Sequence, residues 1–106
     1  MVTYSFVLTT TFQSLDDAER NFVMMPQDPR QQAWIQEWFV KEDGPEVEAD
    51  WDVSTVPYEL NGLVNKVWFT TREAVESYVE LCKELSAEWD LYATYEISEA
   101  DPPITV

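Results

Sequence analysis

The chain of 106 residues contains no histidine, one cysteine and two glycines. Without histidine it lacks the side chain that most often acts as a general base or metal ligand near neutral pH. Glycines at positions 44 and 62 alone cannot form a glycine-rich phosphate-binding loop. The single thiol, Cys82, has no partner in the chain for a disulfide, as is typical of a reducing compartment. We therefore predict a cytoplasmic, non-enzymatic protein that needs no cofactor.

Long hydrophobic runs are also missing. No run approaches the roughly 20 apolar residues of a membrane helix, and the opening residues lack the basic region and apolar core of a signal peptide. The composition is still 45% hydrophobic and 14% aromatic, enough for a packed interior. We expect a single domain over residues 1–98, followed by an extended tail over residues 99–106.

Basic residues are few. Six of them stand against 21 acidic residues, which gives a formal net charge of −15. Such a chain repels nucleic acids and anionic membranes and attracts basic proteins. The charge pattern therefore predicts a basic protein as partner, with no direct binding of nucleic acid or membrane. The alternative that the acidity only keeps the chain soluble stays open.

The first half of the chain predicts a strand and a helix, followed by an ambiguous segment. Residues 3–12 are rich in β-branched and aromatic residues, which indicates a strand. Residues 15–25 have helical spacing, with Ser14 as the N-cap and the apolar side formed by Leu15, Ala18, Phe22 and Met25.

Residues 29–41 fit two structures. Asp28 followed by Pro29 is a good helix start, and Trp34 and Trp38 have helical spacing. Residues 34–41 also fit a strand that leads into a turn. We favour a helix from Pro29 that becomes extended near Phe39.

The second half predicts three strands, a hairpin and a long helix. Residues 46–53 alternate between acidic and apolar side chains, as a half-buried strand does. Asn61-Gly62 indicates a hairpin leading into a strand over residues 63–69. An amphipathic helix follows over residues 71–87, capped by Thr70 and Glu73, and residues 89–98 form the last strand.

A weak internal repeat supports a symmetric layout. Residues 14–23 and 70–79 share a capping residue, an acid, an alanine, an aromatic and a valine at matching offsets. Each copy follows a predicted strand. Two such units predict an α+β, two-layer sandwich with a ferredoxin-like (βαββαβ) antiparallel sheet, two main helices on one face and an inserted hairpin.

Acidic residues concentrate in two places. Residues 42–52 contain six acids and no base, and the second helix carries four glutamates at spacings of 3, 4 and 4. Like charges at these spacings destabilise a helix slightly, so their clustering favours a functional surface. The predicted partner-binding residues are Glu42, Asp43, Glu46, Glu48, Asp50, Asp52, Glu73, Glu76, Glu80 and Glu84.

Two further sites are weaker candidates. Cys82 lies on the apolar side of the second helix, which favours a buried structural thiol over a nucleophile. The acids of residues 46–52 suit Ca²⁺ or Mg²⁺ in type, but a strand spreads them in a line, so we predict no metal site.

The aromatic residues suggest an alternative. Trp68 and Tyr92 would lie on the open face of the sheet, where aromatic side chains favour a dimer contact or a ligand site. The segment VWFTTREAVESYVE (67–80) resembles the strand–helix junction of dimeric α+β-barrel proteins, which include small monooxygenases.

Two functions follow from these patterns. The first is a small acidic binding protein that engages a basic, nucleic-acid-handling protein, as a nucleic-acid mimic would; inhibitors of this kind from phages share its size and acidity. The alternative, implied by the resemblance, is a homodimer that binds or converts a small molecule on the aromatic sheet face.

Overall fold

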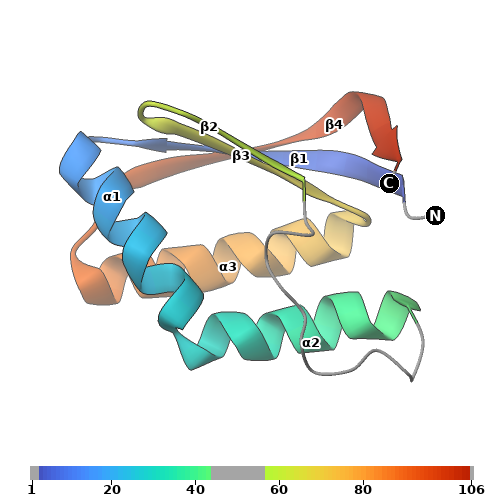
Figure 1. The fold of residues 1–106 in the computed structure, drawn as a ribbon, viewed down its shortest axis with the longest axis horizontal. Coiled ribbons are helices and arrows are strands. Elements are labelled where there is room, and N and C mark those ends of the chain that lie inside the picture. Colours follow the sequence, from blue (N-terminus) through green and yellow to red (C-terminus); the bar gives the residue numbers. More distant parts are fainter. Residues whose placement is uncertain (1–2, 44–56, 106) are drawn as a thin grey trace.

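The computed structural model describes residues 3–43 and 57–105, which form an antiparallel sheet and three α-helices (Figure 1). This confirms the α+β class. In chain order the elements are β1 (Thr3–Phe12), α1 (Leu15–Met24), the 3₁₀ helix η1 (Met25–Gln27), α2 (Pro29–Asp43), β2 (Tyr58–Asn61), β3 (Val64–Phe69), α3 (Arg72–Trp89) and β4 (Ala93–Thr105). The predicted acidic strand over residues 46–53 lies outside the described residues.

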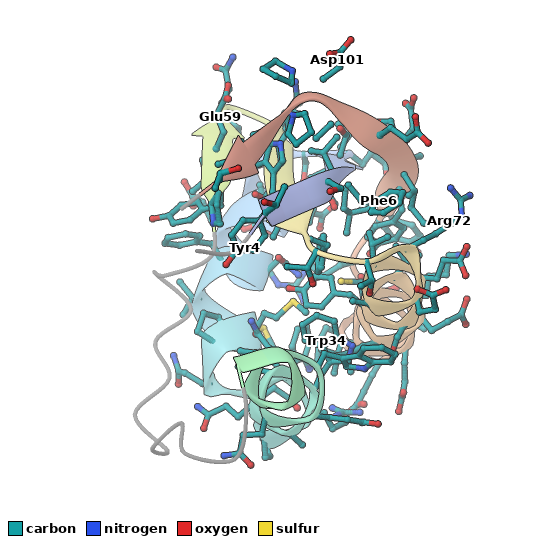
Figure 2. All side chains as sticks on the ribbon, turned by 90° about the vertical axis from the view of Figure 1, so that its right-hand side faces the viewer. Tyr4, Phe6, Trp34, Glu59, Arg72 and Asp101 are labelled. Atoms are coloured by element: carbon teal, nitrogen blue, oxygen red, sulfur yellow. The ribbon has the colours of Figure 1, made fainter. Side chains whose placement is uncertain are left out.

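The sheet has the strand order β2-β3-β1-β4, and every neighbouring pair is antiparallel. Leu8 in β1 lies opposite Val67 in β3 and Ile97 in β4, which fixes the register across the centre. The helices lie on one side of the sheet, with α3 beneath it and α2 farther out (Figures 1 and 2). The other face of the sheet is uncovered by any described element.

The hairpin between β2 and β3 is confirmed, one residue later than predicted. Asn61 pairs with Val64, so Gly62 and Leu63 form the two-residue loop. Gly62 has a φ of 62°, a conformation that side chains disfavour and that the first loop position of a type II′ turn requires. Asn61 is therefore the last residue of β2, and Gly62 supplies the positive φ that the turn needs.

The core lies between the sheet and the two long helices. Leu8 and Phe69 from the sheet are each 1% exposed, and Val75 and Leu85 from α3 are fully buried. Trp34 from α2 packs edge-on against Phe69, with ring centroids 5.8 Å apart, and lies between α2 and α3 in Figure 2. Trp34 therefore connects α2 to both the sheet and α3, because its indole N–H also donates to Ser77 Oγ in α3 (3.1 Å).

Helix α2 is longer than predicted. Its backbone is helical from Pro29 to Asp43, so both the strand and the extended segment from Phe39 were wrong. The Asp28 carboxylate accepts the Arg30 N–H (2.8 Å) and so caps the first turn. Trp34 and Trp38 then stack one turn apart, with ring centroids separated by 6.4 Å. Burial of this aromatic face favours the helix by more than the strand propensity of its residues disfavours it.

Helix α1 is where predicted, but only part of its predicted apolar side is buried, namely Met25 and, in part, Ala18. Leu15 and Phe22, expected in the core, are 61% and 57% exposed, and Asp17 is buried. Arg20 donates to the carbonyl oxygen of Trp89 (2.7 Å), at the C-terminal end of α3. This contact holds the polar side of α1 inward, because the carbonyls at a helix end have no partner within the helix and carry partial negative charge.

Helix α3 confirms the predicted helix over residues 71–87, with a different cap. Thr71, not Thr70, accepts the N–H of Ala74 through its side chain (3.2 Å), so the predicted capping box of Thr70 and Glu73 was wrong. The cap of α1 is Ser14, as predicted. The two halves of the internal repeat are therefore shifted by one residue at their caps. Phe69 is the last residue of β3 and is buried, which leaves Thr70 to complete the connection.

The predicted tail over residues 99–106 is part of the sheet up to Thr105. Strand β4 bulges between Glu99 and Ile104 and then pairs again with β1, Ile104 opposite Tyr4 and Thr105 opposite Thr3. Figure 1 shows the bend in β4, and Figure 2 shows Asp101 pointing away from the helices. The first residues of β1 would otherwise have unpaired backbone groups on that side, and pairing satisfies them.

Candidate acidic interface

Five glutamates form a continuous line on the outer side of α3. Their spacings of 3, 4, 4 and 4 residues place them along one face of the helix, and every one is exposed. We call this line the acidic stripe; it consists of Glu73, Glu76, Glu80, Glu84 and Glu88. The first four were predicted from the sequence, and the last extends the line by one turn.

The stripe faces outward because the opposite side of α3 is buried. Ala74, Val75, Val79, Cys82 and Leu85 recur at helical spacing and pack against the sheet. Apolar burial of this face fixes the rotation of the helix about its axis. The carboxylates are therefore held at set positions on a rigid element.

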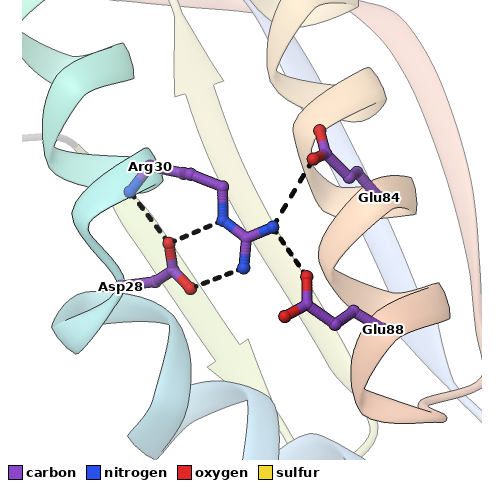
Figure 3. A network of polar contacts seen from close by, with 4 residues as sticks. All are labelled: Asp28, Arg30, Glu84 and Glu88. Carbon is purple, nitrogen blue, oxygen red and sulfur yellow. Dashed lines mark hydrogen bonds and ion pairs between the residues drawn. The ribbon is translucent and has the colours of Figure 1, made fainter.

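Two arginines neutralise part of the stripe. Arg72 binds Glu76 one turn along α3 (Nε–Oε1, 3.0 Å), and Arg30 of α2 binds Glu88 (2.7 Å) and Glu84 (3.4 Å) (Figure 3). Among the residues that the structure describes, no ion pair reaches Glu73 or Glu80. These two glutamates present the least compensated charge of the stripe.

Arg30 is the centre of an interhelical network. Its guanidinium binds both carboxylate oxygens of Asp28 (3.0 Å each) and the two glutamates of α3 (Figure 3). The hydrogen bonds that Arg30 donates to Asp28 and Glu88 raise the pKa of Arg30, and its hydrogen bonds to Asp28 lower the pKa of that carboxyl. The network ties the start of α2 to the last turns of α3. The sequence did not indicate it, because Arg30 and Glu84 are 54 residues apart.

A groove of about 690 Å³ borders the stripe between α2 and α3. Its apolar lining comes from Ala33, Trp34 and Leu81, and its carboxylates come from Glu37, Glu80 and Glu84. Arg30 and Lys83 also line it, but Arg30 is engaged by its three carboxylates. The groove therefore offers apolar contact next to acidic groups.

The charges of the stripe lie close enough together for their electrostatic potentials to add. Neighbouring glutamates are about 6 Å apart along the helix axis, four residues at 1.5 Å each. This spacing is shorter than the Debye length of about 10 Å at 0.1 M salt, so their potentials add at the surface. Cations approaching α3 are attracted by several carboxylates at once.

The other predicted acids are not placed with the stripe. Glu42 and Asp43 belong to the last turn of α2, and their side chains are not described. Glu46, Glu48, Asp50 and Asp52 lie outside the described residues. Of the predicted acidic surface, the structure brings together the four glutamates of α3.

The two aromatic residues predicted to share a sheet face lie far apart. Trp68 pairs with Val7 in the middle of β1, and by strand alternation it lies on the face opposite Phe69. Tyr92 precedes β4, is 59% exposed, and its carbonyl accepts the N–H of Gln13. Six residues of β1 separate the two positions, about 20 Å. They do not form one aromatic surface.

Cys82 of α3 is 5% exposed and packs against Met25 of η1. Burial raises the pKa of its thiol to about 12, so the thiolate is scarce at neutral pH. Within residues 3–43 and 57–105, no cluster of three acids or cysteines is arranged to hold a metal ion. No helix in the described part of the chain is long and apolar enough to cross a membrane.

No family model, no curated protein and no solved structure matches this chain. The function proposed below is therefore inferred from the residues of this chain alone.

Proposed function

We propose that this chain is a small acidic, non-enzymatic binding protein that engages a basic protein through the acidic stripe of α3. The stripe is the observation that carries the proposal: five exposed glutamates on one rigid helix, with Glu73 and Glu80 free of ion pairs in the described residues. The acids of residues 42–52 belong to the same proposal. The net charge of −15 favours fast, salt-dependent association with a cationic surface.

The partner proposed is a protein that handles nucleic acid, with this chain acting as an inhibitory mimic and a phage accessory protein as its closest analogy. The stripe runs from Glu73 to Glu88, about 22 Å, and has one carboxylate per roughly 6 Å, before the pairing with the two arginines is counted. A nucleic acid strand carries one charge per about 3.4 Å. The stripe alone is thus about half as dense, so mimicry on this scale requires the further acids of residues 42–52.

The groove beside the stripe supports a protein partner over a simple cation. Ala33 and Leu81 add apolar contact next to Glu80 and Glu84, and interfaces combine such a floor with a polar rim. Arginine and lysine side chains carry apolar stems below their charged ends, which suits this combination.

The test uses a fluorescent oligoarginine peptide and two double variants of equal charge. Changing Glu73 and Glu80 to Gln removes the uncompensated charges of the stripe. Changing Glu59 and Glu96 to Gln removes two exposed charges from the sheet. We expect the first variant to lose several-fold affinity, mostly in the association rate, and to reduce the salt dependence. Equal losses in both variants would mean that only net charge matters, and would refute the stripe as a site.

The alternative, a dimer with a small-molecule site on the sheet, keeps one supporting observation. Trp68 is half-buried beside Val7 on the open face. The next row of residues on this face is Lys66, Thr9 and Glu96, which makes the face mainly polar. Sedimentation of the intact chain and Trp fluorescence with added apolar ligands test this alternative. A monomer whose Trp fluorescence does not change with these ligands would refute it.

We also propose that the fold is ferredoxin-like and that the protein is cytoplasmic. The fold assignment is supported by the strand order β2-β3-β1-β4 together with helices after β1 and after β3. The location is supported by the lone buried thiol.

A further inference from the structure

Helix α1 exposes an apolar line that the acidic stripe does not explain. Leu15, Phe22 and Val23 are 61%, 57% and 57% exposed, and they are three of the six large hydrophobic side chains exposed among the described residues. They lie seven and eight residues apart, so they share one side of the helix over two turns. Each exposed side chain gives up the stabilisation that burial would provide.

Acidic side chains interrupt this line, and no ion pair among the described residues reaches the one at its centre. Glu19 lies four residues after Leu15 and three before Phe22, in the middle of the apolar side, and it is exposed. Asp16 borders the same side with 78% of its side chain exposed, and it pairs with Arg20 at 3.9 Å. Arg20, the one base of the helix, turns inward to the Trp89 carbonyl. The outward face of α1 is therefore apolar and acidic.

We infer that the outward face of α1 binds an amphipathic helix of a partner protein, one with apolar residues a heptad apart and a lysine or arginine between them. Leu15 and Phe22 stand one heptad apart, the spacing at which two helices interdigitate. A base between the partner's apolar residues would meet Glu19 and satisfy its charge on burial.

The same residues disfavour a second copy of this chain. In a symmetric contact of two α1 helices, Glu19 would lie near its own copy at the centre, where like charges lose their water. The apolar line is about 11 Å long, which suits a single helix and falls short of a stable dimer interface of roughly 800 Å² per partner. The inference is independent of the acidic stripe, which lies on α3.

The test uses two model peptides with the same amphipathic pattern, one of leucine and lysine and one of leucine and glutamate. Binding is measured at 0.5 M NaCl, where exposed charges are screened and the acidic stripe contributes little. Backbone amide shifts report which helix is contacted. We expect the leucine–lysine peptide to bind and to shift the signals of α1 more than those of α3.

Two variants and one control decide the outcome. Phe22→Gln should weaken the leucine–lysine peptide by about tenfold or more, because large apolar side chains dominate such contacts. Tyr58→Gln, a change at a similarly exposed aromatic residue of β2, should alter binding by less than about twofold. Glu19→Lys should transfer the preference to the leucine–glutamate peptide.

Three results would overturn the inference. One is peptide binding that Phe22→Gln leaves unchanged. Another is the absence of peptide binding at 0.5 M NaCl together with shifts confined to α3 in a parallel measurement at low salt, which would assign the binding to the acidic stripe alone. The third is a dimer of the unmodified chain that Phe22→Gln dissociates, which would make a second copy the occupant. Failure of the oligoarginine test at low salt would leave these results unaffected.

Discussion

The hydrogen bond from Arg20 to the end of α3 should contribute substantially to the free energy of unfolding, because it holds α1 against the rest of the domain. Changing Arg20 to Met keeps the apolar stem and removes the guanidinium. The variant loses a 2.7 Å hydrogen bond to the Trp89 carbonyl, and α3 has no basic residue of its own in its last turn. Hydrogen bonds to charged groups contribute about 1.5–3 kcal/mol. Because 41% of the Arg20 side chain is exposed, we take the lower end.

Arg20→Met also removes the cation next to Asp17. That carboxylate is 3.8 Å from the guanidinium, and its side chain is only 11% exposed. Adding about 0.5 kcal/mol for this pair gives a total loss near 2 kcal/mol. For a domain of this size such a loss lowers Tm by roughly 10 °C. Circular dichroism during heating and in urea, at pH 7 and 0.15 M salt, measures it.

Arg72→Met is the matched control. It removes the same charge from an ion pair within α3, in which both side chains are more than half exposed. Exposed pairs of this spacing contribute about 0.3–0.5 kcal/mol. Tm should therefore fall by only about 2 °C. Equal losses in the two variants would refute the role of Arg20 at the end of α3, because both change the net charge equally.

Two further predictions concern α3 and its end. Burial raises the pKa of Cys82 to about 12 from an unfolded value near 9, so the folded chain binds more protons between these values; the free energy of unfolding should be level below pH 9 and fall as pH rises towards 12. At pH 8 iodoacetamide should modify Cys82 far more slowly in the folded chain than in urea, and equal rates would contradict its burial. Asp90 ends α3 in the left-handed region, with a φ of 56°, so Asp90→Gly should raise stability by about 0.5–1 kcal/mol in urea unfolding. Asp90→Ala should not, and an equal gain from alanine would remove backbone strain as the cause.

The regular elements could be predicted because their signals are local. Ser14 caps α1, the apolar spacing of α3 marks its buried face, and Gly62 makes the hairpin turn. Each signal acts within a few residues through backbone hydrogen bonds or side-chain period. The four glutamates of α3 were predicted for the same reason, since residues at this spacing share one face of any helix.

The candidate site beyond α3 could not be predicted, because contacts between distant residues form it. Arg30 reaches across from α2 to Glu84 and Glu88, and the groove exists only where α2 packs on α3. The separation of Trp68 and Tyr92 also follows from pairing, since the register of β1 sets their distance. Residue types alone gave no indication of these neighbours.

By itself the sequence determined the acidity, the class of fold, the hairpin and the helix that carries the acidic stripe. Tertiary structure decided which way α1 faces, how far α2 runs and that residues 99–105 join the sheet. In each case a partner distant in the chain outweighed a local preference. The Trp89 carbonyl accepts a hydrogen bond from Arg20 on the polar side of α1. Trp34 packs the aromatic face of α2 against Phe69 of the sheet. The end of β4 pairs with the first residues of β1. Local patterns fix what an element is, whereas the partners available in the folded chain fix which of its faces is buried.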